Sequence, residues 1–101
     1  MNNEQVEHLD AETLLDVAAD MRSELDRIQE QIAELTRANK RALTLKAIYG
    51  QDALTRERFS LLHEHIDQYA GKMAELREEE RLLTQWLDRC GELLRTSRRA
   101  A

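Results

Sequence analysis

The amino-acid sequence predicts an all-α fold: a long antiparallel helical hairpin of the coiled-coil type that dimerises into a four-helix bundle. Three observations favour it. The 101 residues include no proline, two long stretches repeat apolar residues every three or four positions, and Gly50 separates the two stretches. An all-β domain would need turn residues about every 8–12 positions. The length allows one domain, which we expect to cover 1–101.

The first apolar stripe predicts a helix over about residues 10–48. Its steps alternate between four and three, which is a heptad repeat with apolar a and d positions. One polar residue, Asn39, interrupts the stripe and is a candidate for fixing the register of the pairing. The d positions are Leu14, Met21, Ile28, Leu35 and Ala42, and the a positions are Ala18, Leu25, Ile32 and Asn39.

A turn is expected at residues 49–52. Gly50 suits the left-handed residue that commonly ends a helix. Asp52 or Thr55 can then cap the first N–H groups of the next helix.

The second apolar stripe predicts a helix over about residues 53–97. It has the same alternation, with one polar interruption at Glu80, and Gly71 lies inside it. A helix-internal glycine costs about 1 kcal/mol relative to alanine. The a positions are Phe59, Ile66, Met73, Glu80, Leu87 and Leu94, and the d positions are Leu62, Tyr69, Leu76, Leu83 and Cys90.

Two long helices joined by a short turn should be antiparallel neighbours. Folding the chain about residues 50–51 places Leu35 opposite Ile66 and Ile28 opposite Met73, so apolar positions meet apolar positions. An isolated two-helix hairpin buries little surface per residue. We therefore expect the chain to be a homodimer.

The apolar stripe widens toward the open end of this hairpin, which indicates a second buried face there. Either the N-terminal segment folds back over this face, or a second copy of the chain covers it. We expect self-association, through Leu82, Trp86, Leu93 and Leu15.

Charge is arranged in blocks on a chain with a net charge of −5, and the bases of residues 37–58 gather around the expected turn. We call these bases the basic tip. The pattern favours a solvated helix end, because bases complement a helix C-terminus, and the functional alternative is a surface that binds an acidic protein partner. A nucleic-acid partner is a further alternative that we do not expect, because the chain is acidic overall. The predicted partner-binding residues are Arg37, Lys40, Arg41, Lys46, Tyr49, Arg56 and Arg58.

No group of residues predicts catalysis, a metal or a cofactor. His63 and His65 are two positions apart, whereas metal-binding pairs on helices are usually three or four apart. Cys90 occupies a d position, as a small buried hydrophobe would. No apolar run is long enough for a membrane span, and a single cysteine favours a cytoplasmic protein.

Two family resemblances concern parts of the chain. The stretch Met21–Leu35, with the motif Arg56-Glu57-Arg58 followed by Leu61-Leu62, resembles two helices of the all-helical chorismate mutases. That resemblance implies a mutase or lyase in which Arg22, Arg56 and Glu57 converge on one cavity. The sequence departs from the family at Asn39, where the family carries an active-site arginine. In addition, Ile48-Tyr49-Gly50 resembles the mid-chain turn of the small secreted WxG proteins.

The sequence therefore favours a non-enzymatic protein–protein interaction module over a helical mutase and over a nucleic-acid-binding hairpin. A small bacterial or phage adaptor, inhibitor, regulator or secretion chaperone would have this size and pattern.

Overall fold

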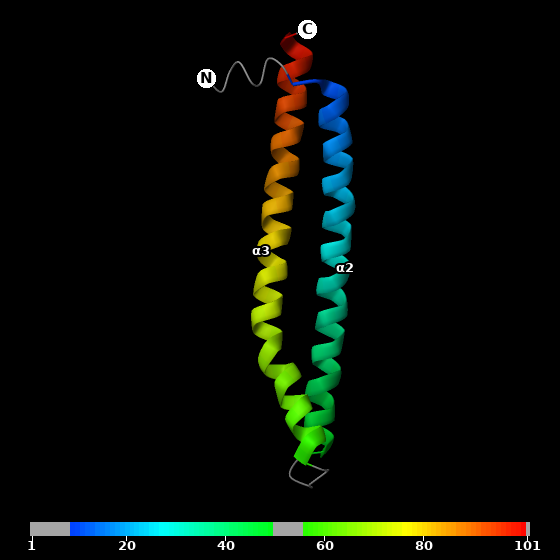
Figure 1. Cartoon of the computed structure of the whole chain (residues 1–101), viewed down its shortest axis with the longest axis vertical. Coiled ribbons are helices and arrows are strands. Elements are labelled where there is room, and N and C mark those ends of the chain that lie inside the picture. The colour runs from blue at the N-terminus through cyan, green and yellow to red at the C-terminus, as the bar shows by residue number, and fades with distance from the viewer. Residues whose placement is uncertain (1–8, 50–55, 101) are drawn as a thin grey trace. The chain divides into compact units, whose positions relative to one another are not determined.

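The computed structural model describes residues 9–49 and 56–100, with side chains described for 9–49 and 60–97. Two helices account for nearly all of it: α2 at Ala11–Tyr49 and α3 at Arg56–Ala100. The predicted all-α helical hairpin is confirmed (Figure 1). Over the described residues, neither helix contains a segment long and apolar enough to cross a bilayer.

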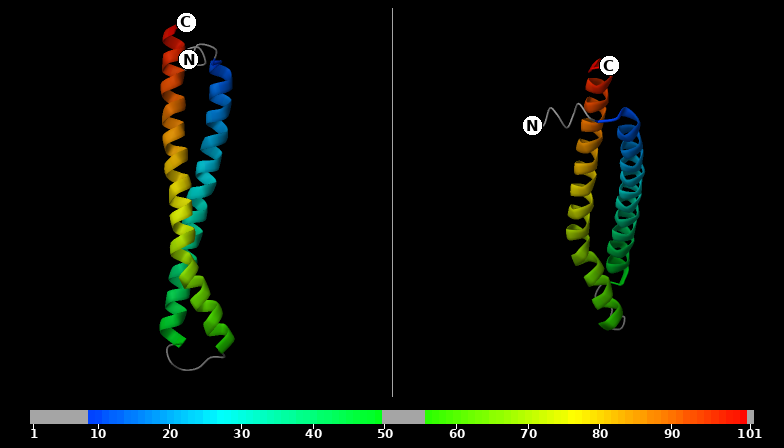
Figure 2. Two further views of the ribbon diagram at one scale, coloured as in Figure 1. Left: turned by 60° about the vertical axis from the view of Figure 1, so that its left-hand side comes forward. Right: turned by 45° about the horizontal axis from the view of Figure 1, so that its top comes forward.

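The chain divides into two compact units, and each contains a segment of both helices. The terminal unit comprises Met1–Ile28 with Glu79–Ala101, and the central unit comprises Gln29–Glu78. Within each unit the α2 and α3 segments lie side by side and run in opposite directions, as all the views show (Figures 1 and 2). Each unit is therefore an antiparallel helix pair.

Asp10 caps the first turn of α2. Its carboxylate accepts hydrogen bonds from the backbone N–H of Glu12 at 3.3 Å and from the Thr13 hydroxyl at 3.0 Å. Its carbonyl accepts the first helical bond, from the Leu14 N–H, at 3.0 Å. An aspartate at this position satisfies N–H groups that have no partner within the helix. The cap explains why α2 begins at Ala11, one residue after the predicted start.

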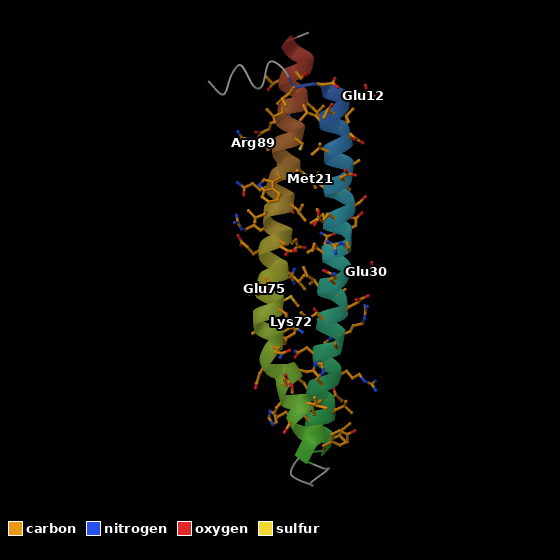
Figure 3. The ribbon with its side chains drawn as sticks, in the orientation of Figure 1. Glu12, Met21, Glu30, Lys72, Glu75 and Arg89 are labelled. Carbon is orange, nitrogen blue, oxygen red and sulfur yellow. The ribbon has the colours of Figure 1, made fainter. Side chains whose placement is uncertain are left out.

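The predicted seam positions are the covered positions of both helices. Every a and d residue from Leu14 to Ala42 in α2, and from Leu62 to Leu94 in α3, is buried or half-buried. Met21 lies between the two helices in Figure 3, whereas Glu12 and Glu30 lie on the outer side of α2. Ile28 is the most deeply buried large side chain, with 1% of its surface exposed. The heptad alternation therefore identified the packed face of each helix correctly.

The register of the central unit differs from the predicted one. Leu35 lines one cavity with Tyr69 and another with Leu76, whereas the sequence placed it opposite Ile66. The pairing is thus displaced along α3 by about one heptad. A slip of a whole heptad keeps a and d positions facing each other, so it preserves the apolar seam.

The helix ends explain the direction of this slip. Helix α2 ends at Tyr49 and α3 begins at Arg56, whereas the sequence predicted helix ends at 48 and 53, so both ends are displaced toward the C-terminus. Tyr49 belongs to α2. Gly50, Asp52 and Thr55, the predicted turn and cap residues, lie outside the described residues.

Candidate functional site

Three of the predicted tip residues form an exposed basic face on α2. Arg37, Lys40 and Arg41 are exposed, and their spacing of three and four places them on one side of the helix. Arg37 and Lys40 occupy heptad positions f and b, which face away from the seam, and Arg41 occupies position c, where it also lines the cavity described below. We call these three residues the basic face.

The other tip residues do not share that exposure. Lys46 and Tyr49 are half-buried, because they continue the a and d positions of the α2 seam. Arg56 and Arg58 belong to α3, but their side chains lie outside the described residues. The structure therefore brings Arg37, Lys40 and Arg41 together and leaves the α3 contribution to the tip undescribed.

Large exposed apolar residues in the central unit were missed by the sequence analysis. Ile48 is 70% exposed, Leu61 58% and Leu43 46%. Ile48 follows Arg41 by one heptad and so occupies the same c position. The heptad pattern could have predicted their exposure, because all three apolar residues lie off the a and d positions of their helices. Their exposure adds apolar surface to the region that carries the basic face.

Cavities in the central unit lie along one flank of its helix pair. The first, here the apolar cavity, has a volume of about 290 Å³. Its lining includes the g residues Ala38, Leu45 and His65 as well as seam residues. Polar groups reach it from Asn39, Arg41, His65 and Tyr69. The complete lining is Leu35, Ala38, Asn39, Arg41, Ala42, Leu45, Leu62, His65 and Tyr69.

A second cavity adjoins the first along the same flank. This charged cavity, of about 430 Å³, shares Leu35 and Ala38 with the apolar one. Its other lining residues are Gln31, Glu34, Lys72, Glu75 and Leu76, and Figure 3 labels Lys72 and Glu75 on α3. Because g residues of both helices line it, the two cavities form one groove on the g flank of the central unit.

The terminal unit carries the residues predicted for self-association. Trp86 is 45% exposed and Leu15 is 52% exposed, whereas Leu82 and Leu93 are half-buried. Trp86 and Leu93 occupy g positions and Leu82 a c position, together with the 40%-exposed Val17 at g in α2. These four residues form what we call the apolar flank. Leu15 occupies an e position, which lies on the opposite side of the seam.

The polar seam residues and the cysteine lie where the heptads predicted. Asn39 and Glu80 are half-buried, and Asn39 lines the apolar cavity. Cys90 is a buried free thiol with 7% of its surface exposed. In the described part of the chain, no buried side-chain nitrogen or oxygen lacks a hydrogen-bond partner.

The remaining chemical candidates do not converge in the described residues. His65 is exposed at the apolar cavity, and His63 is half-buried. No group of three His, Cys, Asp or Glu side chains within 9–49 and 60–97 could hold a metal ion. Arg22, which the mutase resemblance requires, is exposed and lines none of the cavities described above. Its partners in that resemblance, Arg56 and Glu57, have side chains outside the described residues.

No protein-family model matches the chain, and neither the curated proteins nor the solved structures gave a match.

Proposed function

We propose that this chain is a non-enzymatic protein–protein interaction module, a small adaptor or regulator. It acts as a self-associated helical hairpin and binds an acidic protein partner at the basic face of α2. The observation that carries the proposal is the exposure of seven large apolar side chains among the residues that the structure describes. A cytoplasmic setting is part of the proposal, because Cys90 is a free buried thiol.

The exposed area supports self-association. The chain has an accessible surface of 8287 Å². A compact monomer of 11.8 kDa should expose about 5,900 Å². The chain therefore exposes more surface than a compact monomer of its mass. A second copy is the simplest source of cover for this surface, because homo-oligomers with two-fold symmetry are common.

The surface of the central unit supports an acidic protein as the further partner. The basic face provides three exposed cations, and Ile48 and Leu43 provide exposed apolar area in the same helix. Cations beside apolar surface are typical of protein interfaces, in which an apolar centre is surrounded by a polar rim. A nucleic-acid site would instead use aromatic side chains for base stacking. The combination therefore favours a partner with acidic and apolar side chains.

Sedimentation equilibrium of the purified chain tests the self-association. The proposal predicts a mass of twice 11.8 kDa at micromolar concentration. A monomer that persists at several hundred micromolar would overturn this part of the proposal.

Charge reversal tests the acidic partner. The double variant Arg37→Glu with Arg41→Glu should lose a captured host partner, while its helicity stays unchanged. Arg89→Glu with Arg95→Glu is the matched control, because it changes the net charge equally at exposed residues of the terminal unit. If both double variants capture the partner as the wild type does, the basic face is a solvated surface. If the captured material is nucleic acid, the chain is a nucleic-acid-binding hairpin and the proposal of a protein partner is wrong.

A further inference from the structure

The apolar cavity belongs wholly to the central unit, and both helices build it. Leucine and alanine side chains form most of its wall, with Leu35 and Ala42 from α2 and Leu62 from α3. Its volume of about 290 Å³ lies just below the range of about 300–1,000 Å³ found for small-molecule sites. A cavity of about 150 Å³ is already large enough to hold benzene. The apolar cavity therefore has room for one aromatic ring with a short chain.

Four polar side chains reach this cavity, and each of them can donate a hydrogen bond. Asn39 and Arg41 come from α2, and His65 and Tyr69 come from α3. The guanidinium only donates, whereas the amide, imidazole and phenol groups can both donate and accept. Asn39 and Tyr69 are half-buried, and Arg41 and His65 are exposed. Donors beside an apolar wall suit a ligand that has an apolar body and one acceptor-rich end.

The charge at the apolar cavity is positive, although the charges of the whole groove are mixed. None of the residues that line the apolar cavity is acidic. Glu34 and Glu75 line only the charged cavity, together with Lys72. Glu34 precedes Arg41 by one heptad, which is about 10 Å along the helix axis. Within the described part of the chain, no side chain forms an ion pair with Arg41, so its guanidinium can pair with the anion of a ligand.

The acids nearest to this cavity in sequence lie on the outer side of α3. Glu64 and Asp67 occupy f and b positions, which face away from the seam, and both are exposed. The Glu64 carboxylate accepts a hydrogen bond from the Gln68 side chain at 3.3 Å. In α2, no acid occurs between Leu35 and Tyr49. An anion in the apolar cavity would therefore meet a cation and no lining carboxylate.

We propose that the apolar cavity binds a small apolar carboxylate, whose apolar body packs on the leucine and alanine wall and whose carboxylate pairs with Arg41. A guanidinium and a carboxylate can form two parallel N–H···O bonds, which fix the orientation of the ligand. Asn39 and Tyr69 supply further donors for its oxygens. The inference goes beyond the proposed protein–protein contacts, because every group that it uses belongs to one unit of one chain.

Titration of the isotope-labelled chain with phenylacetate, followed by NMR, tests the site. The probe should shift the amide signals of Ala38, Ala42 and His65, with a Kd of about 1 mM or lower, as expected for a ligand of this size. Phenylacetamide keeps the ring but lacks the charge, and acetate keeps the charge but lacks the ring. Each should bind at least tenfold more weakly than phenylacetate.

Two substitutions and a matched control locate the two ends of the ligand. Arg41→Gln should weaken phenylacetate binding at least tenfold and leave phenylacetamide binding unchanged. Arg37→Gln is the matched control, because it removes the same charge one turn away, at an exposed residue that does not line the cavity; it should leave the affinity unchanged. Ala38→Phe fills the cavity from an exposed position, so it should abolish binding of both compounds while helicity by circular dichroism stays the same.

Four results would overturn the proposal. Equal affinities for phenylacetate and phenylacetamide would show a cavity that selects apolar surface alone. Equal losses in Arg41→Gln and Arg37→Gln would show attraction by the overall charge of the tip. No shift of the three signals at ten times the expected Kd would exclude the site. Signals that shift on dilution of the chain but do not respond to phenylacetate would assign the cavity to a second copy of the chain.

Discussion

The terminal and central units share one heptad pattern but differ in packing. The terminal unit contains five of the seven buried apolar residues in the described chain, Leu14, Leu25, Ile28, Leu83 and Cys90. The central unit contains Ile32 and Ala42, and it contains both interhelical cavities described above. The difference follows from side-chain size and polarity, because Asn39, Ala42 and Lys46 occupy consecutive seam positions in the central unit. The period of the apolar residues sets the fold, and their volumes decide where a groove remains.

The largest expected effect is the difference in stability loss between two leucine-to-alanine substitutions, one in each unit. Leu25 is 4% exposed in the terminal unit, and Leu35 is half-buried beside the cavities of the central unit. Leu25→Ala should lower the free energy of unfolding by about 3 kcal/mol. Leu35→Ala should cost about half of that, because less of its surface is buried. Urea unfolding at one protein concentration measures both, and equal losses would contradict the contrast between the units.

Removing the cap at the first turn of α2 should cost less stability than the leucine substitutions. Asp10→Ala removes the acceptor for the Glu12 N–H and the Thr13 hydroxyl, which should cost about 1 kcal/mol. Asp10→Asn keeps an oxygen acceptor and should retain most of the stability. Thermal unfolding of the two variants would contradict the capping role if both lost the same amount.

A gain in stability is expected when the polar residue in the seam of the central unit is replaced by an apolar one. Asn39→Leu should raise the free energy of unfolding by about 1 kcal/mol, since a polar a residue fixes register at a cost in stability. It should also broaden the distribution of oligomeric states. Urea unfolding and analytical ultracentrifugation measure the two effects. A variant that is less stable than the wild type would show that Asn39 makes a hydrogen bond worth more than the apolar contact.

The smallest effects on stability are expected at two helix-internal glycines, one in each unit, and they should be equal. A Cβ at Gly71 would meet no heavy atom within 4 Å, and one at Gly91 would meet only the Arg95 guanidinium at 3.8 Å. Gly71→Ala and Gly91→Ala should therefore each stabilise the chain by about 0.5–1 kcal/mol through helix propensity and a less flexible unfolded chain. Differential scanning calorimetry that found either variant destabilised would reveal a constraint on the backbone at that glycine.

The sequence was sufficient to predict the helices and their packed faces, but not the register or the groove. Burial follows the heptad period, so Leu14, Leu25 and Cys90 could be placed from spacing alone. Register could not be predicted, because displacement by a heptad leaves every apolar layer intact and spacing does not fix the helix ends at Tyr49 and Arg56. The apolar cavity depends on which side chains of α2 and α3 face each other, so it required the register to be known.

The exposed apolar residues also divide into those that the sequence predicted and those that it did not. Trp86 and Leu15 could be recognised from the widened stripe, and both are exposed. Their separation onto the g and e flanks also follows from the heptad positions of the two residues. Ile48 and Leu61 lie off the seam positions, and that deviation was the signal for exposed apolar surface in the central unit.

Hydrogen exchange measured by mass spectrometry over a dilution series tests the central claim, that a second copy of the chain covers its exposed apolar surface. At high concentration, the account predicts slowed exchange over Leu82–Leu93, which carries most of the apolar flank, and loss of this protection on dilution. The amides around Leu25 and Ile28 should remain the most protected at every concentration, because their packing lies within one chain. Protection over Leu82–Leu93 that does not change with concentration would contradict the account.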